Sequence, residues 1–269
     1  MKYLIFTDLD GTLIDHHSYD GAAAIQAVQR LQQNGIPLIF CSSKTFAEQV
    51  PLQRYFGLRQ PFIVENGSAI AIPEHYFPNL PEGAHPFSEG YVLLPLGEKS
   101  IRDIRRVLAR INRQRSSKLF GFTALTLGPI ATATALSRKA AALARQRQFT
   151  ETLLSEPPDA SAMQVLEAAG FSCSRGGRFI SIQDKNIDKG KAVLRLLALF
   201  QEHLKVHPAT IGIGDSHNDL PMLAACDRAF LVQKPDGRYT QTNATHIKTL
   251  PAVGPEGFSM MVAQLLQKN

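Results

Sequence analysis

Two aspartates, Asp8 and Asp10, stand one residue apart in the stretch FTDLDGTL, directly after the apolar run Tyr3–Phe6. In an extended chain, residues i and i+2 project to the same side, so both carboxylates face together while Leu9 faces the opposite side. Close carboxylates repel each other unless a cation, a shared proton or fixed donors compensate. The spacing therefore predicts a charged site at the end of the first strand.

Further polar groups stand directly after three later predicted strands and at the start of a helix. They are Ser42, Ser43, Lys44, Glu65, Asn66, Lys189, Asp215, Asn218 and Asp219. Ligands of open parallel sheets bind where strands end, so these groups are predicted to share one edge with Asp8 and Asp10. Carboxylates from two strand ends suit a hard cation such as Mg²⁺. A lysine, a hydroxyl and a helix N-terminus favour an anion, so the edge suits a phosphoryl group.

Each of these motifs alone is common in a purely structural role. A DG dipeptide is an ordinary turn, a serine after a strand is an ordinary helix cap, and a Lys-Gly pair near a helix start carries little information. Their joint occurrence in this order on one predicted sheet edge favours the functional interpretation.

The elements that would position these groups alternate between strand and helix in two separated parts of the chain. Strands are predicted over 3–7, 37–41, 62–64, 210–213 and 229–232, and helices over 22–33, 45–56, 189–203, 218–225 and 255–267. Alternation of this kind indicates βαβ units and a parallel sheet. We therefore predict an α/β fold with a doubly wound, mainly parallel sheet.

The alternation breaks between these two parts. Residues 73–95 hold five prolines, which is typical of a boundary segment. Beyond them we predict a basic helix, an Ala-rich helix over 134–148, a strand over 149–154, a helix over 160–169 and a hairpin of 171–174 with 179–183. This pattern predicts an inserted α+β domain over 84–184 and a discontinuous core domain of 1–83 and 185–269.

Composition limits the class of protein. None of the apolar runs in the 269 residues approaches the roughly 20 that span a bilayer, and the first is too short for a signal peptide. Cys41, Cys173 and Cys226 are widely spaced and fit neither a disulfide framework nor a zinc site. The sequence predicts a globular, cytoplasmic protein and gives no oligomeric state.

The formal net charge of +6 is unevenly distributed, with six arginines and one acid between Lys99 and Lys118. Such a stripe can be a nucleic-acid footprint. Apolar residues at helical spacing beneath it favour a solvated helix face instead. A third possibility is that some of these arginines attract an anionic small substrate. We expect a small-molecule partner, with no nucleic acid and no membrane.

Four motifs, DLDGT, SSK, Lys189 with its following glycine, and GDSHND, resemble those of the haloacid dehalogenase superfamily of phosphohydrolases. The ENG stretch and the insertion between the second and third motifs resemble the sugar phosphatases of that superfamily that carry a large α+β cap. The resemblance implies a Rossmann-like core and a Mg²⁺-dependent phosphatase. The usual second motif carries threonine followed by glycine or alanine, whereas this chain has Ser42-Ser43.

Carried onto this chain, the resemblance implies that Asp8 is the nucleophile and that Asp10 is the general acid and base. It implies that Asp8, the main-chain carbonyl of Asp10 and Asp215 hold Mg²⁺. Ser42 and Lys189 would bind the phosphate, and Asp219 and Asn218 would lie just outside the metal ligands.

Further stretches, including FIVENG, FTETL, GGRF and GPEGF, resemble the mannosyl-3-phosphoglycerate phosphatase family. This resemblance extends over nearly the whole chain. This implies hydrolysis of mannosyl-3-phosphoglycerate to mannosylglycerate, a compatible solute. Two alternatives stay open within enzymes: glucosyl-3-phosphoglycerate and simpler sugar phosphates. An alternative from another class is a nucleic-acid-binding protein that uses the basic helix over 99–118.

The substrate residues are predicted mainly in and around the insertion. Lys44, Arg175 and Arg178 can pair with a glycerate carboxylate, since a guanidinium fork fits a carboxylate. Glu65 and Asn66 are further candidates. The competing interpretation of the two arginines is that they are solvated at a hairpin tip.

Overall fold

The computed structural model describes residues 1–114, 118–154, 157–176 and 179–267. Its central sheet has five parallel strands in the order β12-β11-β10-β1-β2. These are β1 (Tyr3–Thr7), β2 (Leu38–Phe40), β10 (Ala209–Gly214), β11 (Arg228–Gln233) and β12 (Ile247–Val253). The first strand lies between the second and a strand from the far end of the chain, so the predicted discontinuous, doubly wound parallel sheet is confirmed.

Helices cover both faces of this sheet, and alternate strand residues enter two separate hydrophobic clusters. Ile5 packs on one face with 3-10 helix η1 and helices α1, α2 and α9, while Leu4 and Phe6 pack on the other with α7 and α8. The bounds are η1 (Ala22–Ala24), α1 (Ile25–Gln33), α2 (Phe46–Tyr55), α7 (Lys189–Leu204), α8 (Leu220–Ala224) and α9 (Gly254–Gln267). Because both faces are buried, the strands are apolar throughout.

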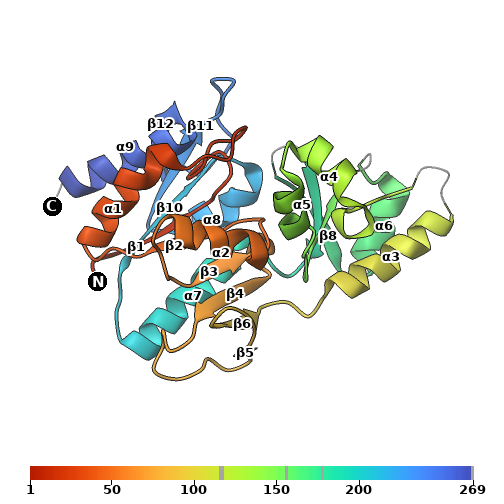
Figure 1. Cartoon of the computed structure of the whole chain (residues 1–269), viewed down its shortest axis with the longest axis horizontal. Helices are drawn as coiled ribbons and strands as arrows, with labels where there is room; N and C mark the ends of the chain where they lie inside the picture. Colours follow the sequence, from red (N-terminus) through yellow and green to blue (C-terminus); the bar gives the residue numbers. More distant parts are fainter. Residues whose placement is uncertain (115–117, 155–156, 177–178, 268–269) are drawn as a thin grey trace.

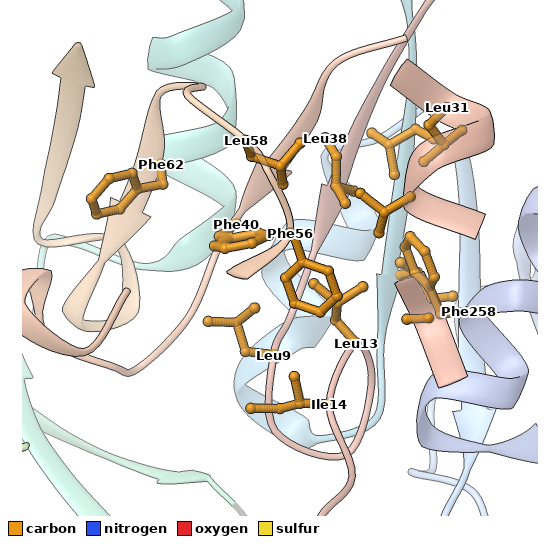
Figure 2. Packing of buried hydrophobic residues seen from close by; sticks show 14 of the residues in the cluster. Leu9, Leu13, Ile14, Leu31, Leu38, Phe40, Phe56, Leu58, Phe62 and Phe258 are labelled. Atoms are coloured by element: carbon orange, nitrogen blue, oxygen red, sulfur yellow. The ribbon is translucent and has the colours of Figure 1, made fainter. Parts of the chain in front are cut away.

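The first cluster extends to the turn that carries the two aspartates. Leu9, Leu13 and Ile14 pack around Phe56 and Phe40 in the core (Figure 2). Leu9 is fully buried, and its burial anchors the stretch between Asp8 and Asp10. The predicted division of this stretch into a buried leucine and two aspartates on the other side is confirmed.

A second, antiparallel sheet continues the core beside β2. Its order is β3-β4-β6-β5, and a parallel bridge between Cys41 and Ile63 joins it to the central sheet. The bounds are β3 (Phe62–Val64), β4 (Ala69–Pro73), β5 (His85–Pro86) and β6 (Tyr91–Pro95). The predicted boundary segment over 73–95 is therefore partly strand, and Val92 and Leu94 pack into the core cluster. We propose that the insertion begins after Leu96 rather than at residue 84.

The inserted segment forms a separate lobe, which we call the cap (Figure 1). Its antiparallel sheet has the order β7-β9-β8. The elements are α3 (Ile101–Arg113), η3 (Phe122–Ala124), α4 (Leu127–Thr134), α5 (Arg138–Ala144), β7 (Glu151–Leu153), α6 (Ala160–Ala168), β8 (Phe171–Gly176) and β9 (Phe179–Asp184). Ile104, Leu166 and Ile182 belong to a buried cluster of the cap's own, as expected of an α+β domain.

Two details of the cap bear on the predictions. The helix expected over 134–148 is shorter, because Ala135 adopts a left-handed φ of 61° that ends α4, and Ser137 then caps α5. The basic stretch forms α3, with Ile104, Leu108 and Ile111 buried and its arginines exposed. The predicted amphipathic helix, with an apolar stripe beneath its arginines, is therefore observed.

Within the described residues, the structure has no helix long and apolar enough to cross a membrane. The cytoplasmic location stays a prediction.

Candidate active site

Lys189 lies at the centre of the predicted site, between two carboxylates. It is the first residue of α7 and is only 1% exposed. Its Nζ atom donates to Asp8 Oδ1 at 2.7 Å and to Asp219 Oδ1 at 2.5 Å. A buried ammonium with two carboxylate partners is compensated, and each carboxylate gains a fixed position.

Asp219 also fixes the loop that follows β10. Its Oδ2 atom accepts the backbone N–H of Asp215 at 3.0 Å and of Ser216 at 2.8 Å. Gly214 permits this fold, because a Cβ there would lie 2.7 Å from the Asp219 side chain. Asp219 therefore places both Lys189 and Asp215.

Three carboxylates converge at this point. Asp8, Asp215 and Asp219 each offer an oxygen, and these atoms lie within 4.8 Å of one another. The other Asp215 oxygen, Oδ2, accepts a hydrogen bond from Ser216 at 2.9 Å, while Oδ1 is buried without a hydrogen-bond partner. Three carboxylates against one ammonium leave excess negative charge, so the residues fit a hard divalent cation.

The electrostatics of the cluster agree with this geometry. Burial raises the pKa of Asp8 well above its usual range; the charge of Asp219 adds to the rise, and Lys189 opposes it. Burial, helped by Asp219, also raises the pKa of Asp215 to about 7. Both carboxylates would regain their ordinary acidity beside a cation.

Asp10 lies beside a different cation. Its Oδ1 atom is 2.9 Å from the Nζ atom of Lys44, which is also 3.7 Å from Glu48 and lies over the ring of Tyr19. Burial lowers the pKa of Lys44, but Asp10 and Glu48 outweigh it and hold that pKa above its usual value. The charge of Lys44, predicted to meet the substrate, is thus already paired with Asp10.

The two serines after β2 differ in position. Ser42 is buried, and its hydroxyl accepts the N–H of Lys44 at 3.3 Å. Ser43 lines a cavity next to Asp8 and Asp10. Phosphate binding by Ser42 stays a prediction.

Glu65 faces the cap, and its role in substrate binding stays a prediction. Its carboxylate accepts the backbone N–H groups of Gln148, Phe149 and Thr150, at 2.8–3.1 Å, and the Thr150 hydroxyl at 2.9 Å. A carboxylate normally accepts about four hydrogen bonds, so these four bonds occupy all acceptor sites of Glu65. The left-handed φ of 49° at Glu65 accompanies this orientation, and the residue joins core to cap.

Asn66 and Gly67 complete the same turn, η2 (Glu65–Gly67). The Oδ1 atom of Asn66 accepts a hydrogen bond from Asn218 Nδ2 at 3.1 Å. Asn218 lies in η4 (His217–Asp219), so this bond links the ends of β3 and β10. The predicted gathering of these two strand ends at one edge is observed.

A cavity lies between the core and the cap. It is lined from both sides by Asp8, Asp10, Lys44, Phe122, Arg147 and Phe179, among other residues. Arg175 lines a second cavity instead, together with His217 and the N-terminal end of α7. Arg178 lies outside the described residues.

A family model described as haloacid dehalogenase-like hydrolase matches residues 5–78 and 147–247. The chain belongs to this family. The match includes β2, β10 and β11 in full, β1 from Ile5 onward and the first residue of β12, together with Asp8, Lys189, Asp215 and Asp219. The resemblance inferred from the motifs is confirmed.

Relatives support the same assignment along the whole chain. A protein of Methanococcoides burtonii is 41% identical over 273 residues, which cover 100% of this chain and 99% of that one. A protein of Persephonella marina is 34% identical, over 98% and 97% of the two chains. Both are named glucosyl-3-phosphoglycerate/mannosyl-3-phosphoglycerate phosphatase. Family and relatives together confirm the predicted enzyme class, a phosphoric monoester hydrolase.

Solved structures share the fold. Thermoplasma acidophilum 0175 matches with a TM-score of 0.70 at 16% identity, over 99% of both chains. The sucrose-phosphatase of Synechocystis, solved with sucrose and phosphate, matches with a TM-score of 0.61 at 18% identity, over 98% of both chains.

This haloacid dehalogenase-like hydrolase also has a polar cavity residue that the sequence did not reveal. Arg147 comes from the cap and donates to the Ser43 carbonyl and the Thr150 hydroxyl. It stands in the stretch RQRQFT, where nothing in the spacing distinguishes it from its arginine neighbour. Its position depends on the cap folding back over the core.

Proposed function

We propose that this enzyme is a Mg²⁺-dependent phosphatase that hydrolyses mannosyl-3-phosphoglycerate to mannosylglycerate and phosphate. The observation that carries the proposal is the contact of Lys189 with Asp8 and Asp219 beside a cavity that Asp8 and Asp10 both line. A carboxylate nucleophile, a paired acid and a buried cation are the groups that phosphoryl transfer from a monoester requires.

In this mechanism an Asp8 oxygen attacks phosphorus, and the bond from phosphorus to the glycerate oxygen breaks. Asp10 gives its proton to that departing oxygen, and an aspartyl phosphate remains on Asp8. Asp10 then takes a proton from water, whose oxygen attacks the same phosphorus; the bond from phosphorus to the Asp8 oxygen breaks, which frees Asp8 and releases phosphate. Lys44, whose Nζ atom is 2.9 Å from Asp10 Oδ1, holds the Asp10 carboxyl group in place.

The remaining groups balance charge. Lys189 compensates negative charge at Asp8 and at the transferring phosphoryl oxygens, and the Ser42 hydroxyl would hold one of those oxygens. Asp219 positions Lys189, and the hydrogen bond of Asn218 to Asn66 supports the loop that carries Asp215.

Mg²⁺ would be held by Asp8, the main-chain carbonyl of Asp10, and Asp215, whose Oδ1 atom is buried without a hydrogen-bond partner. When bound, the ion would neutralise the oxygens of the transferring phosphoryl group. Asp219 is less available as a ligand, because its oxygens already serve Lys189 and two backbone N–H groups.

Glucosyl-3-phosphoglycerate is the second candidate substrate, favoured by the double name of the two relatives. Simpler sugar phosphates lack the glycerate carboxylate and are the third. The nucleic-acid alternative is not favoured, because the matching family is described as hydrolases and both relatives are named as phosphatases, and the charged groups of the active site are all present.

A phosphate-release assay over these esters, with and without Mg²⁺, tests the proposal. We expect kcat/KM to be highest for the two glycosyl-3-phosphoglycerates. A clearly higher kcat/KM for a plain hexose phosphate contradicts the proposed substrate. Absence of phosphate release from every ester contradicts the proposed phosphatase activity.

A further inference from the structure

Arg147 is a buried cation of the active-site cavity with unused hydrogen-bonding capacity. It follows α5 in the cap, is 9% exposed, and lines the cavity together with Asp8 and Asp10. A buried guanidinium is costly unless its donors are satisfied, so its hydrogen bonds can be accounted for one by one.

A guanidinium has five N–H donors in a fixed planar arrangement. Nη1 donates to the Ser43 carbonyl at 3.3 Å and to Thr150 Oγ1 at 2.7 Å, and Nη2 donates to the same carbonyl at 3.3 Å. Nε is buried without a partner. The two remaining donors, Nε–H and the second N–H of Nη2, point the same way along one edge, which is the edge that a carboxylate bridges with two parallel hydrogen bonds.

The other edge is held rigidly from the core. The Thr150 hydroxyl accepts from Arg147 and donates to Glu65 Oε2 at 2.9 Å, and Glu65 is fixed by three backbone N–H groups of the cap. The Phe122 ring lies 5.8 Å from the guanidinium carbon. Thr150 and Ser43 thus hold the arginine in one position and leave its other edge without a partner. This fixed position lowers the entropy lost when a ligand binds.

Other cations near the cavity are already paired or lie elsewhere. Lys44 pairs with Asp10 and Glu48, and Lys189 with Asp8 and Asp219. Arg175 lines the second cavity. Among the residues that the structure describes, Arg147 is therefore the arginine that lines the active-site cavity, and no carboxylate lies within ion-pair distance of it.

We propose that Arg147 is a specificity-determining residue that binds the carboxylate of the substrate, so that the enzyme selects phosphate esters of hydroxy acids over neutral sugar phosphates. The inference rests on the proposed phosphatase function. In 3-phosphoglycerate only two carbons separate the carboxylate from the phosphate oxygen, so both groups must enter the same cavity. This assigns to Arg147 the role that the sequence suggested for Lys44, Arg175 and Arg178.

The test compares Arg147→Met and Arg147→Lys with the unchanged enzyme on two substrates, glucosyl-3-phosphoglycerate and glucose 6-phosphate. We expect the ratio of kcat/KM for the first over the second to fall about 10- to 100-fold in Arg147→Met, since a bidentate charged pair is lost. Arg147→Lys should recover only part of the ratio, because an ammonium lacks the planar fork. Arg138→Met, at an exposed position at the start of α5, is the matched control and should leave the ratio within about twofold.

A binding measurement separates recognition from structure. Titration with glucosylglycerate, which keeps the carboxylate and lacks the phosphate, should show a dissociation constant raised about tenfold or more in Arg147→Met. If both substrates lose kcat/KM equally and product affinity is unchanged, Arg147 is only structural and the inference is wrong. If the unchanged enzyme itself shows no preference for the carboxylated ester, the proposed substrate fails independently of Arg147.

Discussion

Gly67 lies directly against the first peptide of α7: a Cβ on Gly67 would lie 2.2 Å from the carbonyl oxygen of Asp188. Its φ of 97° is also one that other residues adopt with strain. The turn that docks the cap therefore contacts the helix end that carries Lys189. Any side chain at position 67 must push Asp188 and Lys189 out of place.

Gly67→Ala should consequently lower both stability and activity. Overpacking and the unfavourable φ together should cost about 2–4 kcal/mol of unfolding free energy. Urea unfolding and kcat on the preferred ester measure the two effects. Gly128→Ala is the matched control, because nothing lies within 4 Å of that position in α4, and it should be neutral or slightly stabilising. Equal behaviour of the two variants would contradict the proposed contact.

Asp8→Asn should abolish turnover without unfolding the protein. Asparagine cannot attack phosphorus, so kcat should fall by at least about 10³-fold, roughly 4 kcal/mol in the barrier. The fold should persist, because burial already disfavours the charged form of Asp8 and Lys189 keeps Asp219 as a partner. Circular dichroism and a phosphate-release assay give the two readouts, and activity near that of the unchanged enzyme would refute the nucleophile assignment.

Glu65→Gln should loosen the cap from the core. The amide keeps one oxygen and turns an NH₂ group toward N–H donors, which should cost about 1–3 kcal/mol of unfolding free energy. KM should rise as well, since Thr150 no longer fixes Arg147 through Glu65. Glu82→Gln, at an exposed position, serves as the control. The role of Glu65 as a core–cap link fails if neither stability nor KM differs between the two variants.

Removal of divalent cations with a chelator should abolish activity, and added Mg²⁺ should restore it. Mg²⁺ at one hundred times its dissociation constant should also stabilise the protein by about 2.7 kcal/mol. Asp215→Asn should lose most of this stabilisation, whereas the exposed Asp236→Asn should retain it. Thermal unfolding with and without Mg²⁺ measures the shift, and full activity in chelator would exclude the proposed cation.

Glu151 should make the stability of the cap depend on pH. Burial raises its pKa above the ordinary 4.5, although Thr123 donates to it. A carboxyl whose folded pKa exceeds its unfolded pKa costs nothing below both values and destabilises the fold as pH rises between them. The unfolding free energy of the unchanged protein relative to Glu151→Gln should therefore fall as pH rises above about 4.5 and then level off. A difference that stays constant from pH 4 to 8 would contradict the raised pKa.

Periodicity was sufficient to predict the parallel core. The predicted strands of the central sheet are short, continuous apolar runs that are buried on both faces, and helix caps such as Asp188 mark where helices begin. The strands that were missed have weaker patterns. β4 and β6 end in prolines, which resemble loop signals, and β12 is an edge strand with Pro251 inside and mostly exposed residues.

The candidate site likewise contains residues that the sequence predicts and residues that it does not. Asp8, Asp10, Lys189 and Asp215 were predictable because each follows a strand or begins a helix, and the topology brings such ends together. The contact of Glu65 with the cap was not predictable, because it depends on a left-handed backbone that turns the carboxylate to the cap. Arg147 was missed because its place depends on the docking of two lobes, which sequence spacing does not encode.

The pairing of β1 with β10 also determines when the central sheet can form during synthesis of the chain. The first strand is synthesised early, yet its neighbour on one side ends at Gly214, and Lys189 comes 181 residues after Asp8. The cap has a hydrophobic cluster of its own between these two halves, so it can fold while β1 still waits for its partner. Nascent chains shorter than about four-fifths of the full length thus leave one edge of β1 unpaired and have no complete catalytic centre.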